Sequence, residues 1–336
     1  MKVFVSGSNG YVGSLLVPHL LADGHEVVGF DTQYFGDAFL PKDNGRLKLI
    51  KGDIRDTNAV AAAMYGCDAA LWLACISNDY GCNLDEKLSE EINIHAFEPC
   101  VLAAKSSGIK RFIYCSSSSV YGINDLPDVT EDCELIPVTL YNRSKMACEK
   151  LLLPHHSNDF TCAILRPATV CGPAPRMRFD LTVNVMTRDA VCKGGITVFG
   201  GSQKRPNLHI KDMVAAYKLM LKAPKERIGG EAFNVGRQNM TVLEIAQLIK
   251  QVVEREMGKP VTVDVQGFAD NRSYKVNSDK IAKRLGFTPQ HSVEDAIRDI
   301  CLRFKSNYWP DALTNPNYTN ILQYVQQGMG AQKGGG

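Results

Sequence analysis

The sequence lacks a long hydrophobic run, a clear excess of either charge, and a secretory signal pattern. No apolar stretch is long enough to cross a bilayer. The N-terminus has no charged segment followed by an apolar one, as a signal peptide would have. A net charge of +2 over 336 residues provides no bulk electrostatic basis for binding nucleic acid or a membrane surface. These absences predict a soluble, cytoplasmic protein.

The cysteines also lack the patterns that would give them a structural role. There are 11, an odd number, and they are scattered from Cys67 to Cys301. No pair has CxxC spacing, and no group of cysteine and histidine residues has the spacing of zinc ligands. We therefore interpret them as reduced thiols in a reducing compartment, and we expect no metal site.

What the first half does contain is a regular alternation of short apolar runs and amphipathic stretches. Near-continuously apolar strands that alternate with helices are typical of a parallel sheet buried on both faces. The fold class predicted is α/β, a Rossmann-type doubly wound sheet. Strands are expected at 2–6, 26–30, 47–51, 69–74, 111–115 and 161–165, and helices at 11–22, 57–64, 92–106 and 140–153.

The alternation ends after Arg166-Pro167, and a mixed pattern follows. Helices are expected at 182–191, 211–222, 242–257, 279–285 and 293–308, and strands at 196–199, 232–235 and 261–265. We predict a cofactor-binding domain over 1–170 plus about 207–240. A smaller α+β substrate-binding domain would comprise 171–206 and 241–325. The Gly-rich segment 326–336 is expected to be a disordered tail.

A glycine-rich turn follows the first strand and opens the first helix. Gly7, Gly10 and Gly13 form the pattern GxxGxxG. The first two allow a tight turn and close approach of the backbone to a pyrophosphate, and the third lets the helix pack against the strand. The free N–H groups of the helix N-terminus, at Tyr11 and Val12, would then face the phosphates. This context predicts a dinucleotide site, which also includes Asn9.

Three strand ends complete the predicted cofactor site. Asp31 ends the second strand, where a carboxylate accepts hydrogen bonds from both ribose hydroxyls and repels a 2′-phosphate, so NAD is favoured over NADP. Asp53-Ile54 follows the third strand, beside the expected adenine. Leu73-Ala74-Cys75 ends the fourth strand, beside the pyrophosphate and the nicotinamide ribose.

Tyr141 and Lys145 lie one helical turn apart on the same face of a predicted helix. The ammonium is expected to lower the pKa of the phenol, so that Tyr141 acts as a base toward a substrate hydroxyl, or as an acid in reverse. The run Ser116–Ser119 follows the strand at 111–115 and offers a hydroxyl to the forming carbonyl. Together these groups predict hydride chemistry on an alcohol or ketone.

With these motifs in place, the chain resembles the extended short-chain dehydrogenase/reductase family, in its nucleotide-sugar epimerase and dehydratase branch. The resemblance extends over nearly the whole chain. It is carried by GxxGxxG at 7–13, GDIRD at 52–56, SSSSVYG at 116–122, YxxxK at 141–145, LRP at 165–167, Arg205 with HIxD at 209–212, FNVG at 233–236 and LGFxP at 285–289. It implies tightly held NAD and a smaller domain that binds a nucleoside diphosphate sugar.

The resemblance also implies roles for individual residues. It makes Ser117 the catalytic hydroxyl, Tyr141 the acid/base and Lys145 the group that holds the nicotinamide ribose. Asn93, Ser116 and Pro167 join the cofactor set. The substrate set is Ser77, Asn78, Ser117, Ser118, Thr169, Arg178, Arg205 and Arg272, with Arg176 a further candidate for the diphosphate.

The residues after Ser117 help to choose a reaction within this branch. Relatives that eliminate water carry an acidic pair there, whereas this chain has Ser118 and Ser119, which do not ionise near neutral pH. The resemblance therefore favours a nucleotide-sugar epimerase acting at C4. A nucleotide-sugar 4-ketoreductase or dehydrogenase is the alternative. A non-enzymatic NAD sensor is a third reading, which the intact catalytic set disfavours.

Four further features leave alternatives open. Cys75 stands where a catalytic thiol or a small apolar residue would fit, and Cys171 replaces an aromatic residue of the family. His209 is a sugar contact or, more in keeping with its spacing to Asp212, a structural residue between domains. Phe97, Val101 and Ala104 form a stripe on the helix at 92–106. By the resemblance, that helix and the one at 140–153 lie where the family forms a four-helix dimer interface, so a homodimer is expected.

Overall fold

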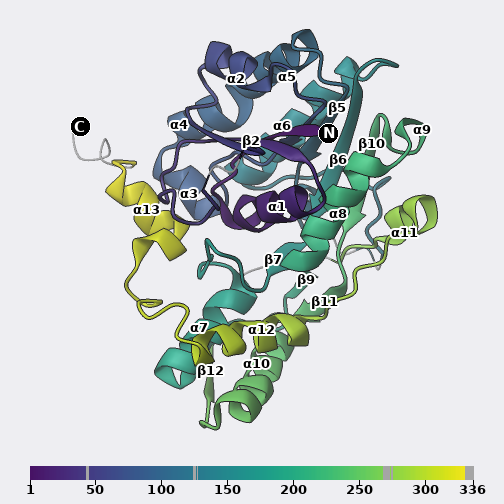
Figure 1. The fold of residues 1–336 in the computed structure, drawn as a ribbon. Coiled ribbons are helices and arrows are strands. Elements are labelled where there is room, and N and C mark those ends of the chain that lie inside the picture. The colour runs from purple at the N-terminus through teal and green to yellow at the C-terminus, as the bar shows by residue number, and fades with distance from the viewer. Residues whose placement is uncertain (43–44, 124–125, 127, 268–272, 274, 330–336) are drawn as a thin grey trace, which may run out of the picture.

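A seven-stranded parallel sheet forms the centre of the protein in this computed structural model, which describes all residues except 43–44, 124–125, 127, 268–272, 274 and 330–336 (Figure 1). The strand order is β3-β2-β1-β4-β5-β6-β10. The chain thus leaves β1 in both directions, as in a doubly wound fold. The strands are β1 Lys2–Ser6, β2 Glu26–Asp31, β3 Leu47–Lys51, β4 Ala69–Trp72, β5 Arg111–Cys115, β6 Thr161–Pro167 and β10 Glu231–Val235. The predicted Rossmann-type fold class is confirmed.

Helices cover both faces of this sheet, because its strands are apolar on both sides. On one face α1 (Tyr11–Ala22) and α8 (Ile210–Lys222) pack through Leu16, Met213 and Tyr217. On the other face α2 (Thr57–Met64), α5 (Phe97–Ser106) and α6 (Leu140–Leu152) cover an aromatic core that includes Trp72 and Phe112, whose rings stack at 5.7 Å. All seven residues of β6 are buried, as expected for a central strand.

Two small sheets and three helices form a second region below the first in Figure 1. Residues Val183, Ile249 and Ile297 belong to its separate core. The three-stranded sheet has β7 Thr169–Cys171, β9 Lys204–His209 and β11 Gln238–Thr241, and the two-stranded sheet has β8 Gly195–Phe199 and β12 Thr262–Gln266. The helices are α7 Thr182–Lys193, α10 Val242–Met257 and α12 Val293–Lys305. Capping boxes at Thr241 and Ser292 begin α10 and α12.

The single helix predicted at 92–106 is two elements, and its apolar stripe has another role. A π-helical turn, η1 (Glu91–His95), precedes α5. Phe97, Val101 and Ala104 are fully buried in the core against the sheet, so they provide no dimer surface. The large apolar residue of α5 that is exposed is Leu102, at 50%. The stripe was wrong as an interface signal because the same spacing serves core packing.

Short elements that the pattern did not predict lie mainly around the loop after β4 and at the C-terminus. They include α3 (Asp79–Leu84), α4 (Glu86–Glu90) and α13 (Asn320–Gln326). The others are α9 Lys225–Ile228 and the 3-10 turns η2 Ser118–Tyr121, η3 Leu153–His155 and η4 Pro316–Tyr318. Such short helices show little periodicity of their own, although the seven-residue α11 Asp279–Leu285 was predicted with its bounds.

The C-terminal segment returns to the main domain instead of extending away from it. In Figure 1 α13 lies beside α3, far from the preceding helix α12. Asn320, Gln323 and Tyr324 form its buried face, and Met329 is buried as well. The disordered tail predicted from 326 is therefore wrong for 326–329, and 330–336 lie outside the described residues. Within the described part of the chain, no helix has the length and apolar character needed to cross a membrane.

Candidate active site

One large cavity, of about 400 Å³, lies at the carboxyl ends of the central strands. Its walls include residues that follow β1, β2, β4, β5 and β6, together with the start of β7. This is the crevice where the strand order reverses, and where doubly wound sheets bind their ligands. It brings together most of the predicted cofactor residues, namely Gly7, Gly10, Tyr11, Val12, Asp31, Asp53, Ile54, Leu73, Ala74, Cys75, Ser116, Tyr141, Lys145 and Pro167.

The glycine turn has the geometry that its spacing predicts. Gly7 has φ +71°, and a Cβ there would lie 2.9 Å from the backbone nitrogen of Ala74. A Cβ on Gly13 would overlap the carbonyl oxygen of Gly7. Helix α1 begins at Tyr11, directly after Gly10, without a side chain that caps its first N–H groups. These N–H groups and the close backbone packing fit a dinucleotide pyrophosphate.

Asp31 is held at the end of β2 by backbone donors. Its carboxylate accepts hydrogen bonds from the N–H of Asn9, at 3.0 Å, and of Gln33, at 2.7 Å. Burial raises the pKa of this carboxyl above its usual value. Asn9 itself does not line the cavity: its side-chain amide donates to the carbonyl of Gly36, so it supports the loop after β2.

Tyr141 and Lys145 are on one face of α6, and both line the cavity. The Lys145 Nζ atom donates to the carbonyl of Cys115 at 2.7 Å and lies 5.7 Å from the centre of the Tyr141 ring. Burial raises the pKa of Tyr141, and the Lys145 ammonium lowers it by a smaller amount. The predicted lowering of the pKa by the ammonium is thus present, but in the protein alone desolvation of the phenolate outweighs it and the pKa of Tyr141 is raised.

Ser117 and Ser116 differ in how their hydroxyls are used. The Ser117 Oγ lies 2.8 Å from the Ser119 Oγ and accepts the backbone N–H of Ser119 at 3.2 Å. The Ser116 Oγ donates instead to the buried carboxylate of Glu149, which pairs with Arg166 at 2.7 Å. The Ser116 hydroxyl is thus bonded to a buried carboxylate of the protein. The Ser117 hydroxyl, at the cavity wall, contacts another hydroxyl and can exchange that contact for one to a ligand.

The predicted substrate residues that the structure describes also line this cavity: Ser77, Asn78, Ser117, Ser118, Thr169, Arg178 and Arg205. Arg178 already has a counter-ion, because its guanidinium forms two 3.0 Å hydrogen bonds to Asp180. It also donates to the Ser77 Oγ at 3.1 Å, and Asn78 donates to Asp180 at 3.1 Å. Arg272 lies outside the described residues.

Asn93 stands behind the cavity and does not line it. Its side chain accepts the N–H of Ile76 at 2.8 Å and donates to the Ile76 carbonyl at 2.9 Å. The two bonds hold the loop after β4 in place, because the Asn93 amide satisfies both backbone groups of Ile76 as a neighbouring strand would. The predicted contact of Asn93 with the cofactor is therefore indirect.

The cavity residues that sequence reasoning missed include Tyr34, Phe35, Asn320 and Tyr324. The first two belong to the loop after β2, and the last two belong to α13. The signal that was available is the spacing of Asn320, Gln323 and Tyr324, which gives a short helix one buried face. Nothing in the sequence shows that this face packs beside the loop after β2, where Gln323 donates to the carbonyl of Tyr34, 289 residues earlier in the chain.

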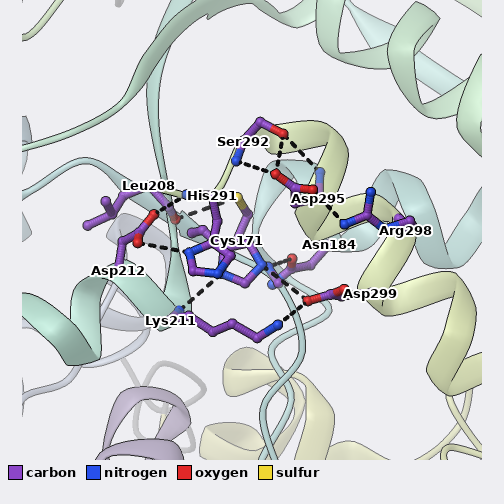
Figure 2. Close-up of polar contacts among 12 residues, drawn as sticks. Cys171, Asn184, Leu208, Lys211, Asp212, His291, Ser292, Asp295, Arg298 and Asp299 are labelled. Carbon is purple, nitrogen blue, oxygen red and sulfur yellow. Dashed lines mark hydrogen bonds and ion pairs between the residues drawn. The ribbon is translucent and has the colours of Figure 1, made fainter. Parts of the chain in front are cut away.

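A second polar cluster joins α8 and β9 to the loop before α12 and to α12 itself, and we call His209, Lys211, Asp212, His291 and Asp299 the junction cluster. Figure 2 shows Lys211, Asp212, His291 and Asp299 of this cluster. Asp212 accepts two hydrogen bonds from His291, from the ring at 2.9 Å and from the backbone at 2.8 Å. His209 is fully buried, and its Nδ1 accepts the N–H of Lys211 at the start of α8. It does not line the cavity, so its structural reading is supported.

Asp299 joins α12 to this cluster. Its carboxylate lies 2.6 Å from the Nζ of Lys211 and 3.7 Å from the Nε2 of His209. Burial alone would raise its pKa, but His209 and Lys211 outweigh burial and hold the pKa well below its usual range. No group of three or more metal-ligating side chains occurs in the part of the chain that the structure describes.

Residues 3–236 match the family model described as "NAD dependent epimerase/dehydratase family". Among curated proteins, the chain is similar to a UDP-glucose 4-epimerase from Mycolicibacterium smegmatis, with 27% identity over 88% of this chain and 96% of that enzyme. It is 30% identical to a 3 beta-hydroxysteroid dehydrogenase/Delta 5-->4-isomerase from Mycobacterium tuberculosis. That match covers only 65% of this chain and 59% of that enzyme.

Among solved structures, the chain is similar to UDP-glucuronic acid 4-epimerase from Bacillus cereus in complex with UDP-glucuronic acid and NAD. The TM-score is 0.81 and the identity is 27%, over 92% of this chain and all of that one. The likeness extends through the smaller region as well as the central sheet.

Proposed function

Because the chain belongs to the NAD-dependent epimerase/dehydratase family, we propose that it is a nucleotide-sugar epimerase that inverts C4 of its substrate. NAD is the cofactor of this family, and the glycine turn and Asp31 fit its pyrophosphate and ribose. The observation that carries the proposal is the group Ser117, Tyr141 and Lys145 in one cavity with that turn. Two relatives that match over almost their whole length are a UDP-glucose 4-epimerase and a UDP-glucuronic acid 4-epimerase.

In the proposed mechanism these three side chains move the proton of the C4 hydroxyl and stabilise the C4 oxygen. Tyr141 removes the proton from the C4 hydroxyl and later returns it, and Ser117 donates a hydrogen bond to the C4 carbonyl oxygen. Lys145 keeps the phenol able to give up its proton, since its charge acts against the desolvation of the phenolate. NAD, when bound, supplies a reversible acceptor for the C4 hydride.

The side chains beside Ser117 limit the chemistry to this exchange. Elimination of water needs a further acid and base near C5 and C6, and Ser118 and Ser119 provide neither. Asp79 also lines the cavity, but its carboxylate accepts a 2.6 Å hydrogen bond from Thr139. This supports epimerisation over dehydration.

We further propose that the smaller region, 171–206 with 241–325, binds the nucleoside diphosphate. The support is Arg205 on β9, a guanidinium at the cavity wall that suits a diphosphate. A homodimer through α5 and α6 remains a proposal that rests on the resemblance and on the exposed Leu102. Light scattering of Leu102→Lys against the natural protein tests it, and an unchanged mass for a dimeric protein contradicts this interface.

A ketoreductase or dehydrogenase is the second candidate, because Ser117, Tyr141 and Lys145 also suffice for a single hydride transfer. The partial likeness to a hydroxysteroid dehydrogenase favours it, whereas the matches to epimerases extend further along both chains. The two candidates differ in one measurable respect. An epimerase returns every hydride, so that it consumes no free cofactor.

The experiment incubates the purified protein in D₂O with UDP-glucose, UDP-glucuronic acid and dTDP-glucose in turn. Proton NMR follows the product, and absorbance follows reduced nicotinamide. We expect one substrate to give its C4 epimer, without deuterium in the product and without net change in NADH. Deuterium at C5 with loss of water would show a dehydratase. Stoichiometric use of NAD(P)H would show the second candidate.

A further inference from the structure

Arg176 is a buried cation with an incomplete set of partners. Its side chain lines the cavity, and the residue is only 1% exposed. The guanidinium carbon lies 3.6 Å from the centre of the Phe35 ring, and one terminal nitrogen donates to the Asn320 side chain. Its Nε has no hydrogen-bond partner, and within the described ranges no carboxylate lies in ion-pair distance of the guanidinium. Arg178, two residues on, is fully paired with Asp180.

Such an arrangement is unfavourable unless an anion completes it. A buried charge is stabilised by a counter-ion and by hydrogen bonds to its remaining donors, and removing it from water without them is expensive. Burial lowers the pKa of Arg176 to about 9, a direction that shows how poorly the protein alone compensates this charge. The stacked Phe35 ring stabilises a cation only in part.

The position of Arg176 indicates which anion it would bind. Its backbone N–H donates to the Oγ of Ser14 at 3.2 Å, and Ser14 lies on the first turns of α1. The cavity wall also includes Tyr11 and Val12, whose N–H groups begin this twelve-residue helix. A helix N-terminus and a guanidinium then border the same space, and each of them favours negative charge there.

We propose that Arg176 is the side-chain counter-ion of the cofactor's pyrophosphate, and that α13 holds it in place. The proposal concerns cofactor binding and does not depend on which sugar reacts or at which carbon. It assigns Arg176 to the cofactor and not to the substrate diphosphate, for which the sequence had made it a candidate.

Helix α13 provides the support on the other side of the guanidinium. Asn320 accepts from Arg176 and donates to the Ser77 Oγ at 2.9 Å. The Tyr324 ring lies 5.9 Å from the ring of Phe35, and Gln323 donates to the carbonyl of Tyr34. The loop 34–35 is thus held between the arginine and α13. A dinucleotide beneath this loop leaves only after α13 or the loop moves, which predicts slow release of the cofactor.

The test measures binding of nucleotide fragments to the full-length protein freed of co-purified nucleotide. ADP carries the pyrophosphate, adenosine lacks it, and UDP represents the substrate's nucleotide. Arg176→Met removes the charge but keeps much of the side chain's length, and Arg176→Lys restores the charge. Arg303→Met is the matched control, because Arg303 is exposed and also stacks on an aromatic ring, Tyr308, at 4.8 Å. Affinity is read by calorimetry and thermal shift.

We expect Arg176→Met to weaken ADP binding about tenfold to a hundredfold, as loss of hydrogen bonds to a charged group does. Adenosine and UDP should bind as before, and Arg176→Lys should recover part of the loss for ADP. Arg303→Met should change nothing. Asn320→Ala should weaken ADP binding by a smaller factor and shorten the time for which the protein retains NAD through gel filtration.

Three results would overturn the proposal. Equal losses for ADP and adenosine would show that Arg176 only shapes the cavity. A loss confined to UDP would assign it to the substrate, and unchanged ADP binding in a folded Arg176→Met protein would remove it from the site. If Arg176→Met does not fold, Arg176→Lys and Asn320→Ala decide, since unaltered ADP affinity in both contradicts the assignment. None of these measurements requires turnover.

Discussion

The active-site cavity and the junction cluster both bury charged side chains, but among the described residues only the cavity has a buried charge, Arg176, without a counter-ion. In the junction cluster Asp212 is bonded twice to His291, and Lys211 lies 2.6 Å from Asp299 (Figure 2). In the cavity the guanidinium of Arg176 keeps an unused donor. Buried groups that satisfy one another stabilise a fold, whereas buried groups left incomplete mark a place for a ligand.

The pKa values of two carboxyls, Asp31 in the cavity and Asp299 in the junction cluster, are shifted in opposite directions. Burial raises the pKa of Asp31 in the cavity, where it accepts only backbone hydrogen bonds within the described structure. For Asp299 in the junction cluster, burial is outweighed by His209 and Lys211, and the pKa is lowered. One carboxyl is thus prepared for hydroxyl donors of a ligand, and the other is already neutralised by the protein.

The largest effect is expected from Tyr141→Phe, which removes the acid/base of the cavity. Turnover of any sugar nucleotide should fall about 10²- to 10⁴-fold, the usual contribution of general acid–base catalysis. The free energy of unfolding and the amount of retained NAD should change little, because the ring remains. Steady-state kinetics and nucleotide release on denaturation measure the two. A variant with full turnover would remove Tyr141 from the mechanism.

Asp212→Ala tests the junction cluster, because it removes the carboxylate that His291 is bonded to. We expect a loss of about 1–3 kcal/mol in the free energy of unfolding, since both donors of His291 lose their acceptor. Urea unfolding followed by circular dichroism measures it. Asp279→Ala is the control, as this exposed carboxylate forms an i,i+4 pair with Lys283, and such changes stay near ±0.5 kcal/mol. Equal effects in the two variants would contradict the distinction.

A smaller effect is expected from the acid titration of Asp299. Because its pKa is lower in the folded protein, its contribution to stability is present above the unfolded pKa of about 4 and is lost as the pH falls below that value. Asp299→Asn should therefore be less stable than the natural protein at pH 7. The difference should shrink toward pH 2–3. Thermal melts across this range would refute the ion pairing if the difference did not depend on pH.

The smallest effect, and the opposite sign, is expected for Asp31. Its pKa is raised in the folded protein, so the folded state holds the proton longer and this group's contribution falls as the pH rises above about 4. Asp31→Asn should slightly stabilise the protein without NAD at pH 7 and weaken its binding of NAD. Melts with and without NAD show both changes. A stabilised variant that binds NAD normally would contradict the ribose contact.

Much of the central domain was predictable, because its signals are local. The boundaries of β1, α1, β3 and α2 match those predicted, and each element has its own apolar period and turn residues. That Tyr141 and Lys145 line the same cavity was also predictable, since they share a helix face. The net pKa of Tyr141 was not, because it depends on how completely distant segments exclude water from the phenol.

The role of the α5 stripe and the positions of the short helices were not predictable for a similar reason. The stripe Phe97, Val101 and Ala104 has the same spacing whether it faces the sheet or a partner, and only the packed structure shows that it is core. The short helices α3 and α13 have weak patterns of their own, and they lie side by side through contacts remote in sequence.

The sequence by itself determined the parallel sheet, the glycine turn between β1 and α1, and the helix that carries Tyr141 and Lys145, and it predicted NAD through Asp31. Each of these follows from residues close together in the chain, where backbone geometry and periodicity decide the structure. Only the tertiary structure decided that Arg178 is paired and Arg176 is not, and that Asn320, 144 residues away, holds the unpaired one. Whether a buried charge finds a partner depends on which distant segments meet around it, and no local pattern encodes that.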